Sequence, residues 1–286
     1  MYEVSIVIPC YNGASVIIPQ LTALAAQADA RTEIIVADNR SSDDIETVVR
    51  EFARRVDADI RVVSANDRQG INHARNCGIR ASSGQFVLLC DADDVVSDGW
   101  VARMVSVLRL GAECVGGAMH RCTPDGKTIE YTRGVTTRFW KRAGVYVGYA
   151  TGANCGFTRS LFDRLGGFDE DFAGGSDEND FFVRASLSGR RPVLVAEAVV
   201  DYTQRARLRD AMRQNVAYGV GGVRLHRKFA HEGMPRDSWW VPPVTVVVST
   251  ISCFIGSSSH RRIGAERLAR RWGRLRGSLR LRHLYL

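Results

Sequence analysis

The sequence is poor in proline, has no long hydrophobic run and shows no pattern of paired cysteines. Only 7 of its 286 residues are proline, while 45% are apolar and 24% are charged, which excludes a disordered chain. The apolar stretch at residues 244–256 has 13 residues, fewer than the ~20 that a membrane-spanning helix needs. Length and composition therefore predict a full core, in one large α/β domain or in one domain with an appendage.

The cysteines argue against a disulfide-stapled or zinc-finger protein. There are seven, an odd number, and no two of them have CxxC or metal-finger spacing. Free thiols in a reducing compartment fit this pattern better, which places the folded part in the cytosol. The first ten residues lack the basic region and the cleavage site of a signal peptide, so we expect them to form a strand.

The excess of positive charge is confined to one end of the chain. Of 39 basic and 31 acidic residues, nine arginines and one glutamate lie in residues 260–286, which leaves 30 of each sign in residues 1–259. Proteins that bind nucleic acid more usually spread basic residues over a groove or a face of the folded body. We therefore expect no nucleic-acid partner.

Short apolar runs alternate with helical patterns through the first ninety residues. Apolar residues repeat at helical spacing in residues 45–52, where Ser41 and Asp44 resemble a capping box. This alternation predicts a doubly wound, mostly parallel sheet with helices on both faces. The expected strands are residues 4–9, 33–37, 60–64 and 86–90.

A ligand of such a sheet binds at the carboxyl ends of its strands. The fold would gather four polar segments along that edge, at residues 10–13, 38–41, 66–70 and 91–94. Two standard phosphate motifs are missing, because there is neither a GxxxxGK[ST] loop nor an intact GxGxxG after the first strand. A nucleotide at this edge would have to be held in another way.

Three carboxylates fall within four residues after the fourth predicted strand. Asp91, Asp93 and Asp94 repel one another unless a cation or hydrogen-bond donors offset their charge. Oxygen ligands at this density suit a hard divalent ion, Mg²⁺ or Mn²⁺, completed by phosphates and water. The plainer alternative is a solvated turn in which Asp93 or Asp94 caps the following helix.

Several motifs, in this order and at these intervals, resemble the family 2 glycosyltransferases over about residues 4–205. The resemblance implies a GT-A fold, a nucleotide-sugar donor and a D-x-D motif. Asn66 and Gly70 belong to the segment that would run under the donor. The other matching stretches are the opening strand and turn at 4–12, the second strand and its acidic turn at 34–43, residues 74–79, and the D-x-D at 91–93.

The resemblance assigns roles on the side of the nucleotide. It implies that Pro9, Tyr11 and Asn12 line the nucleotide pocket and that Asp38 accepts a hydrogen bond from the base. It also places Arg75 near the nucleotide and its phosphates. The plainer interpretations are a turn-forming aspartate at 38 and a surface helix residue at 75.

The resemblance also implies the metal site. Asp91 would approach the ribose or the metal, and Asp93 would ligate the metal that bridges the diphosphate. Many members of the family have a histidine after a later strand that can join the metal ligands. Here the strand-like run at 193–201 is followed by no histidine, and Asp201 or Tyr202 occupies the region. The last metal ligand therefore stays open.

The second half of the resemblance concerns the acceptor. Residues 148–157 are rich in small residues, as expected of a chain that passes close to a ligand. Residues 166–170 resemble the acceptor-side G-G-F-D-E, and residues 177–180 resemble the acidic E-D-x-D element that opens a helix. The usual two acids are exchanged in identity, so Glu178 aligns with the catalytic base and Asp177 is the alternative. A plainer reading is that these acids favour the helix dipole.

The C-terminal segment has the pattern of a cationic amphipathic helix. Leu268, Trp272, Leu275 and Leu279 share one face, and arginines fill the others. Such a helix typically lies in a membrane interface, although its three glycines lower its helix propensity and favour folding on binding. The alternative is a helix packed on the rest of the chain or on a second subunit.

These observations predict an α/β protein of GT-A type with a C-terminal helical, membrane-associating extension. The expected division is a catalytic domain at 1–205, with donor half 1–95 and acceptor half 96–205, a helical extension at 206–240 and the apolar and basic tail at 241–286. The expected activity is metal-dependent, inverting transfer from a UDP-sugar or a related donor to a hydroxyl of a glycan or lipid-linked acceptor. The expected location is the cytoplasmic face of the cell membrane. The alternatives are a non-catalytic nucleotide-sugar-binding scaffold and a sugar nucleotidyltransferase.

Overall fold

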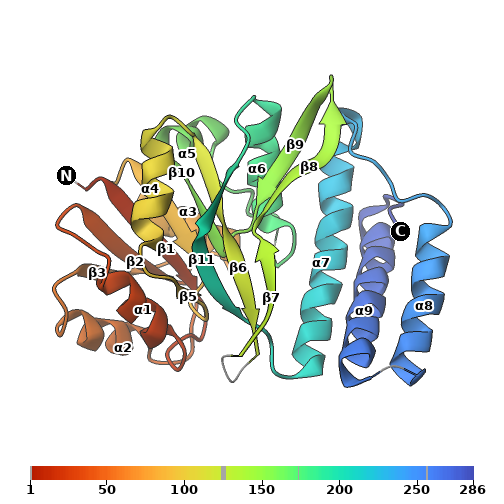
Figure 1. Ribbon diagram of the computed structural model, residues 1–286, viewed down its shortest axis with the longest axis horizontal. Coiled ribbons are helices and arrows are strands. Elements are labelled where there is room, and N and C mark those ends of the chain that lie inside the picture. The colour runs from red at the N-terminus through yellow and green to blue at the C-terminus, as the bar shows by residue number, and fades with distance from the viewer. Residues whose placement is uncertain (1, 124–126, 173, 256) are drawn as a thin grey trace. The chain divides into compact units, whose positions relative to one another are not determined.

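The computed structural model describes residues 2–123, 127–172, 174–255 and 257–286 (Figure 1). Within these residues, one sheet contains nine strands in the order β3-β2-β1-β4-β10-β6-β11-β5, with β7 paired to β6. A separate hairpin is formed by β8 (Val135–Arg142) and β9 (Val145–Ala150). The strands of the sheet are β1 (Val4–Cys10), β2 (Thr32–Asp38), β3 (Asp59–Ser64), β4 (Phe86–Cys90), β5 (Val95–Val96), β6 (Cys114–Cys122), β7 (Thr128–Arg133), β10 (Asn154–Thr158) and β11 (Val193–Thr203).

The first four strands confirm the predicted apolar runs to within one residue at each end. All seven residues of β1 are buried, and β1 pairs in parallel with β2 on one side and with β4 on the other. A strand buried on both faces is mostly apolar, which explains the continuous rather than alternating pattern, and the one polar side chain of β1, Ser5, is hydrogen-bonded to Glu33. Beyond β4 the sheet becomes mixed, because β10 runs antiparallel to both β4 and β6.

Helices cover both faces of the sheet, as the strand–helix alternation predicts. Ile6 and Ile8 of β1 join one apolar core, and Val7 between them joins the other, because successive side chains of a strand point to opposite faces. The first core is completed by α1 (Ile17–Ala25), α2 (Ile45–Ala53) and α4 (Trp100–Arg109), and the second by α3 (Ile71–Arg80), α5 (Arg159–Leu165) and α6 (Asp177–Leu187).

The chain forms two compact units, and the sheet belongs to the first. The second consists of residues 140–145, 171–177 and 204–286. Its helices are α7 (Leu208–Phe229), a short 3₁₀ helix (Ala230–Glu232), α8 (Val241–Ile255) and α9 (Ser258–Leu281). Within this unit α9 lies between α7 and α8 (Figure 1). The functional division expected from the sequence, at 95, 205 and 240, stays a prediction.

One local expectation is wrong. Asp44 stands at the N-cap of α2 without a side-chain capping bond, and the Ser41 hydroxyl accepts from the Asn12 backbone instead, so the proposed capping box is not formed. The glycines of the basic segment do not prevent a helix, because α9 is continuous and packs closely with its glycine side. The predicted apolar run lies in α8, and its last residue, 256, lies outside the described residues.

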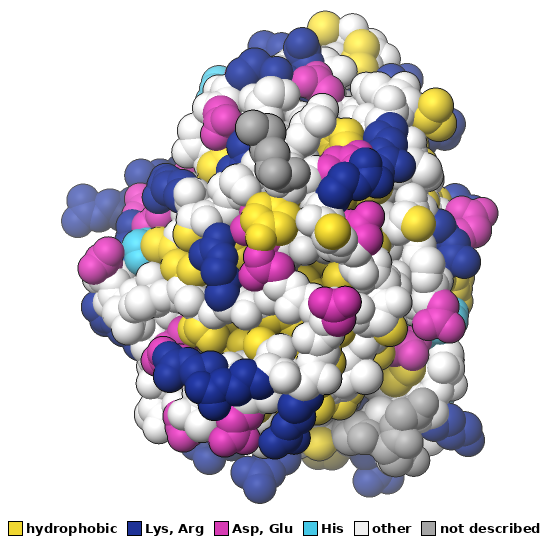
Figure 2. All heavy atoms as spheres, turned by 90° about the vertical axis from the view of Figure 1, so that its left-hand side faces the viewer, with side chains coloured by type: hydrophobic (Ala, Val, Ile, Leu, Met, Phe, Trp, Pro, Cys, Tyr) yellow, Lys and Arg dark blue, Asp and Glu magenta, His cyan; other side chains and the backbone are white. Residues whose placement is uncertain are grey.

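The charge pattern of the surface agrees with the count from the sequence. On the face drawn in Figure 2, acidic and basic side chains are interspersed, and neither sign forms a continuous field. Across the described residues, no helix combines the length and the apolar character needed to cross a membrane.

Candidate active site

The loops that follow β1 and β2 are joined by hydrogen bonds at the carboxyl edge of the sheet. The backbone N–H of Asn12 donates to the Ser41 hydroxyl at 2.9 Å, and the Asn12 side-chain oxygen accepts from the Ser42 N–H at 2.7 Å. The Asp43 carboxylate accepts from the Ala14 N–H at 2.8 Å. Asn12 has φ +53°, a left-handed conformation that asparagine tolerates better than most residues. The predicted convergence of these two loops is therefore present.

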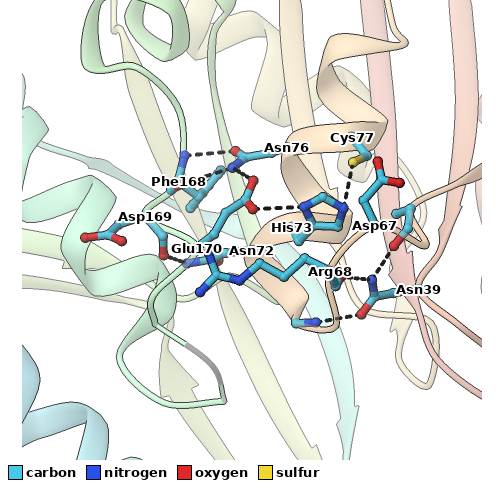
Figure 3. Close-up of polar contacts among 12 residues, drawn as sticks. Asn39, Asp67, Arg68, Asn72, His73, Asn76, Cys77, Phe168, Asp169 and Glu170 are labelled. Atoms are coloured by element: carbon cyan, nitrogen blue, oxygen red, sulfur yellow. Dashed lines mark hydrogen bonds and ion pairs between the residues drawn. The ribbon is translucent and has the colours of Figure 1, made fainter.

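The loop after β3 is tied to the same edge by Asn39. Its buried side-chain amide donates to the carbonyls of Ala65 and Arg68 at 2.5 and 2.7 Å, and its oxygen accepts from the Gly70 N–H at 2.7 Å (Figure 3). Three hydrogen bonds from one side chain thus fix a loop of six residues. Sequence reasoning assigned no role to Asn39, because its partners are backbone groups that no motif reveals.

The residues expected to hold the nucleotide base differ in exposure. Pro9 is buried within β1 opposite Ala37, while the Tyr11 side chain is 58% exposed just beyond the strand. Asp38, half-buried at the end of β2, accepts from the Ser41 N–H at 3.1 Å. An exposed aromatic ring can stack on a planar base, and a carboxylate at a strand end can accept from it.

The acidic turn after β4 is held by a buried glutamine. The Gln20 amide donates to the Asp91 carbonyl at 3.2 Å, and its oxygen accepts from the Val96 N–H at 2.9 Å, so α1 clamps both ends of the turn. Asp94 is buried and accepts from the Thr203 N–H of β11 at 3.2 Å. Asp91 and Asp93 are only partly buried. Asp94 therefore has a structural hydrogen bond, whereas Asp91 and Asp93 stay partly exposed at the carboxyl edge of the sheet.

Arg75 is the largest buried cation of this edge. It is only 2% exposed, and its guanidinium lies 3.2 Å from the Asn72 side-chain oxygen, 3.8 Å from the Asp91 carboxylate and 5.7 Å from the centre of the Phe168 ring. Gly152 makes room for it, since a Cβ there would lie 2.3 Å from the guanidinium. The alternative of a surface helix residue is therefore wrong. A buried guanidinium beside a ligand edge is suited to bind an oxyanion.

Three side chains of α3 hold the turn at residues 168–170. Asn72 donates to the Asp169 carbonyl at 2.9 Å, and the Asn76 amide donates to the Glu170 carboxylate at 2.8 Å (Figure 3). Asn76 also bonds the N–H and the carbonyl of Phe168, each at 2.9 Å. His73 places Nδ1 2.9 Å from the other oxygen of Glu170. The helix that carries Arg75 is thus fastened to the segment that resembles the acceptor-side motif.

Glu170 is held ionised by this arrangement. Partial burial acts to raise the pKa of its carboxyl group, but the hydrogen bonds from Asn76 and His73 outweigh burial and keep that pKa below its ordinary value. The other ring nitrogen of His73 lies 3.4 Å from the Cys77 sulfur, and burial raises the pKa of the Cys77 thiol. A thiol with a raised pKa is a poor nucleophile, so we assign this group a structural role.

The acids at the start of α6 have different surroundings. Asp180 is fully buried and pairs with Arg184 at 2.8 Å, and Arg184 also donates to the carbonyls of Leu165 and Gly167. Asp177 is 6% exposed, whereas Glu178 is partly exposed. The helix-dipole interpretation therefore does not describe Asp180, whose carboxylate has a specific partner.

Two buried thiols report which charged groups lie together. Burial, together with the carboxylates of Asp43, Asp38 and Asp93, raises the pKa of Cys10 to about 12. Burial also raises the pKa of Cys155, against the effect of Arg75 and with that of Glu178 and Asp91. Asp38 and Asp93 thus lie around the Cys10 thiol, and Arg75, Glu178 and Asp91 lie around the Cys155 thiol.

The described part of the chain offers few ligands for a divalent metal. Over the described ranges, no group of three or more His, Cys, Asp or Glu side chains is gathered as a metal cluster. Asp201 of β11, which stands near where the family often has a histidine, instead pairs with His120 at 3.1 Å. Asp93 and Asp91 remain as two oxygen ligands, which suits Mg²⁺ or Mn²⁺ only if phosphate oxygens and water complete the sphere.

The sequence matches known proteins over its first part. The family model described as Glycosyl transferase family 2 matches residues 5–166, more than half of the chain. Glycosyltransferase AglE of Haloferax volcanii is 34% identical over 128 residues, which cover 44% of this chain and 42% of that protein. The Escherichia coli UDP-Glc:alpha-D-GlcNAc-diphosphoundecaprenol beta-1,3-glucosyltransferase WfgD is 31% identical over 106 residues, 37% of this chain and 39% of WfgD. The matches thus span less than half of these relatives.

Solved structures extend the likeness over nearly the whole chain. The mannosyltransferase PcManGT from Pyrobaculum calidifontis, in complex with GDP-Man and Mn²⁺, has a TM-score of 0.66 at 20% identity, covering 97% of this chain and 88% of that one. TarS 1–349 of S. aureus, in complex with UDP-GlcNAc, has a TM-score of 0.54 at 14% identity, covering 98% and 92%. At these identities the likeness establishes the GT-A fold. Together with the family match, it shows that the chain belongs to the family 2 glycosyl transferases.

Proposed function

We propose that the chain transfers a sugar from a nucleoside diphosphate sugar to a hydroxyl group of a lipid-linked glycan. One observation carries this proposal. Arg75 is buried at the carboxyl edge of the parallel strands, 3.8 Å from Asp91, with Gly152 leaving room for its guanidinium. A cation buried in that position has a clear use if the ligand brings phosphate groups.

The nucleotide end of the donor would lie over β1 and β2. Tyr11 and Asn12 follow β1, Asp38 ends β2, and the hydrogen bonds between their loops preorganise both. Pro9 supports this wall from within β1. A UDP-sugar is the donor that we favour, because WfgD is named as a UDP-Glc-dependent enzyme, although the PcManGT complex holds GDP-Man.

Asp93, with Asp91, would hold a divalent metal against the diphosphate. When bound, the metal would neutralise phosphate charge and favour departure of the nucleoside diphosphate. Complexes of PcManGT and of GalNAc-T7 contain Mn²⁺, which supports Mn²⁺ or Mg²⁺ here. Asp94 is not proposed as a ligand, since its carboxylate accepts from the Thr203 N–H.

Glu178 is proposed as the general base, with Asp177 as the alternative. Glu178 takes the proton of the acceptor hydroxyl, whose oxygen forms the new bond to the anomeric carbon while the bond to the donor phosphate breaks. A single displacement of this kind inverts the anomeric centre. Asp177 is almost fully buried, whereas Glu178 is partly exposed. Glu178 affects the pKa of the buried Cys155 thiol, as Arg75 and Asp91 also do.

The acceptor is proposed to be lipid-linked. WfgD and a Campylobacter jejuni relative, which is 29% identical over 117 residues, are both named for an undecaprenol-linked substrate. An enzyme on such substrates gains from residence at the membrane, so we propose peripheral attachment at the cytoplasmic face, aided by the basic C-terminal segment.

The test of this proposal is a thermal-shift screen of nucleoside diphosphates with and without Mn²⁺. A ligand that binds only the native state raises its melting temperature. We expect UDP with Mn²⁺ to stabilise the protein more than UDP alone, and Arg75→Gln to remove that stabilisation. No stabilisation by any nucleoside diphosphate would contradict the proposal.

A further inference from the structure

Helix α8 presents its large apolar side chains to solvent. Trp240, just before the helix, and Val244, Val247, Ile251 and Phe254 recur at i, i+4, i+7, i+11 and i+14, and so lie along one side, which we call the outer stripe. These five side chains are between 49% and 78% exposed. In a water-soluble helix this side would normally carry the polar residues.

The opposite side of α8 is small and polar. Thr245, Ser249 and Ser252 lie there, and Ser249 is buried. The hydroxyls of Thr245 and Ser252 donate to the helix's own carbonyls at 2.7 and 2.9 Å, so they need no water. Gly264 of α9 packs against this side, because a Cβ there would lie 2.7 Å from the Ser249 carbonyl. The polarity of α8 is therefore inverted, with small polar residues inside and large apolar residues outside.

Helix α9 likewise packs on α7 through a small residue and leaves large apolar side chains exposed. A Cβ on Gly273 would lie 2.2 Å from the Val216 carbonyl, so the two backbones meet across a glycine. Trp272 and Leu279 point away from that contact and are 59% and 73% exposed. Small residues between helices and large apolar residues outside are the packing rule of helices in lipid, where apolar side chains need no cover from protein.

The distribution of charge indicates which kind of lipid surface fits. Residues 238–259 contain no charged side chain, and α8 lies within them. On α9, Arg276 and Arg280 are exposed and follow Trp272 at intervals of four, which puts them beside the apolar side chains. Other arginines of α9 are engaged by acids of the same unit, as Arg271 and Arg274 are by Asp237 at 2.9 and 2.7 Å. The exposed arginines complement anionic headgroups.

We infer that the outer stripe of α8, with Trp239 and the exposed apolar residues of α9, inserts into the interface of an anionic lipid bilayer. This inference deepens the membrane location proposed above and rests on it. With 15 residues α8 is about 22 Å long, shorter than the ~30 Å hydrocarbon core, so it lies in one leaflet. The mode of attachment is thus apolar insertion by α8, and the arginines of α9 add attraction to anionic headgroups.

The test is flotation of the full-length protein with vesicles of phosphatidylcholine, with and without phosphatidylglycerol. We expect Val247→Asp/Ile251→Asp to reduce binding by roughly tenfold or more, because charged side chains are strongly disfavoured in the apolar interface. The control Leu110→Asp/Ile129→Asp places the same two charges at exposed apolar residues of the first unit and should bind like the wild type. Arg276→Gln/Arg280→Gln should weaken binding only to vesicles with phosphatidylglycerol, and less so at high salt.

Two results would overturn the inference. One is undiminished flotation of Val247→Asp/Ile251→Asp. The other is a wild-type dimer, seen by light scattering, that this double variant converts to a monomer, which would make a second copy the occupant of the stripe. The same samples are tested for stabilisation by UDP and Mn²⁺. Flotation of a wild-type protein that binds no nucleotide would defeat the proposed function and leave this inference standing.

Discussion

At the scale of the residue, the three carboxylates after β4 have the same chemistry and different surroundings. Asp94 is buried and bonded to the backbone of β11, while Asp91 and Asp93 are partly exposed at the ligand edge. The sequence could show only that three acids are crowded together. Which of them serves the fold depends on β11, a strand more than a hundred residues away, which no local motif announces.

Substitutions of Asp93 and of Asp94 should therefore have different effects. Asp93→Asn should remove the Mn²⁺-dependent part of UDP affinity with little loss of stability. Asp94→Ala should leave the partly buried Thr203 N–H without its acceptor and lower the free energy of unfolding by about 1–3 kcal/mol. Titration calorimetry with and without Mn²⁺ and denaturant unfolding measure the two effects. Equal losses of stability would contradict the different roles.

Gly152 tests the position of the Arg75 guanidinium without removing it. In Gly152→Ala the new Cβ would lie 2.3 Å from the guanidinium, which must move. We expect UDP to bind about tenfold more weakly, a change of 1.4 kcal/mol. Gly222→Ala in α7 is the control, since its Cβ would meet only ordinary contacts. If Gly152→Ala binds UDP like the wild type, the assignment of Arg75 to the phosphates is wrong.

At the scale of the element, α3 does two things that its sequence shows only in part. Its resemblance to the family indicated Arg75, and the structure adds Asn72, His73 and Asn76 as the link to residues 168–170. Strand limits were predictable because burial on both faces demands unbroken apolar runs. The roles of side chains such as Asn39, Gln20 and Asn76 could not be predicted, because these side chains form hydrogen bonds with backbone groups of segments distant in sequence.

The link through Glu170 should make stability depend on pH in a defined direction. The folded state lowers the pKa of this carboxyl group from its ordinary 4.5, so the ionised form stabilises the fold. That contribution is complete above the ordinary pKa and is lost as the pH falls through the lower, folded value. The melting temperature of Glu170→Gln should lie below that of the wild type at pH 7, and the gap should close in acid.

The matched control for this experiment is Glu51→Gln on the exposed side of α2. Its melting temperature should follow the wild-type curve over the whole pH range, because its ion pair with Arg55, at 3.8 Å, is exposed. A gap for Glu170→Gln that persists unchanged into acid would show that the carboxylate charge does not contribute.

At the scale of the whole molecule, the pattern of charged residues was a better guide to the structure than the glycines of α9 were. The count of charged residues separates a balanced body, residues 1–259, from a basic end. The glycines of α9 were taken as a weakness of the helix, but Gly264 and Gly273 are where neighbouring backbones approach most closely. Helix propensity cannot reveal this, because the compensating contacts come from α7 and α8. The family match covers residues 5–166, so helices α7, α8 and α9 lie beyond it.

The central claim is that this edge of the sheet performs glycosyl transfer with Glu178 as base. The most direct measurement is UDP release from a set of UDP-sugars by the full-length protein, with Mn²⁺ and an undecaprenyl diphosphate-linked sugar as acceptor. We predict acceptor-dependent release by the wild type. Glu178→Gln should reduce turnover by on the order of 10²–10⁴ while UDP affinity is kept, and Asp177→Asn should reduce it far less. Full turnover by Glu178→Gln, or equal and small effects of both substitutions, would contradict the account.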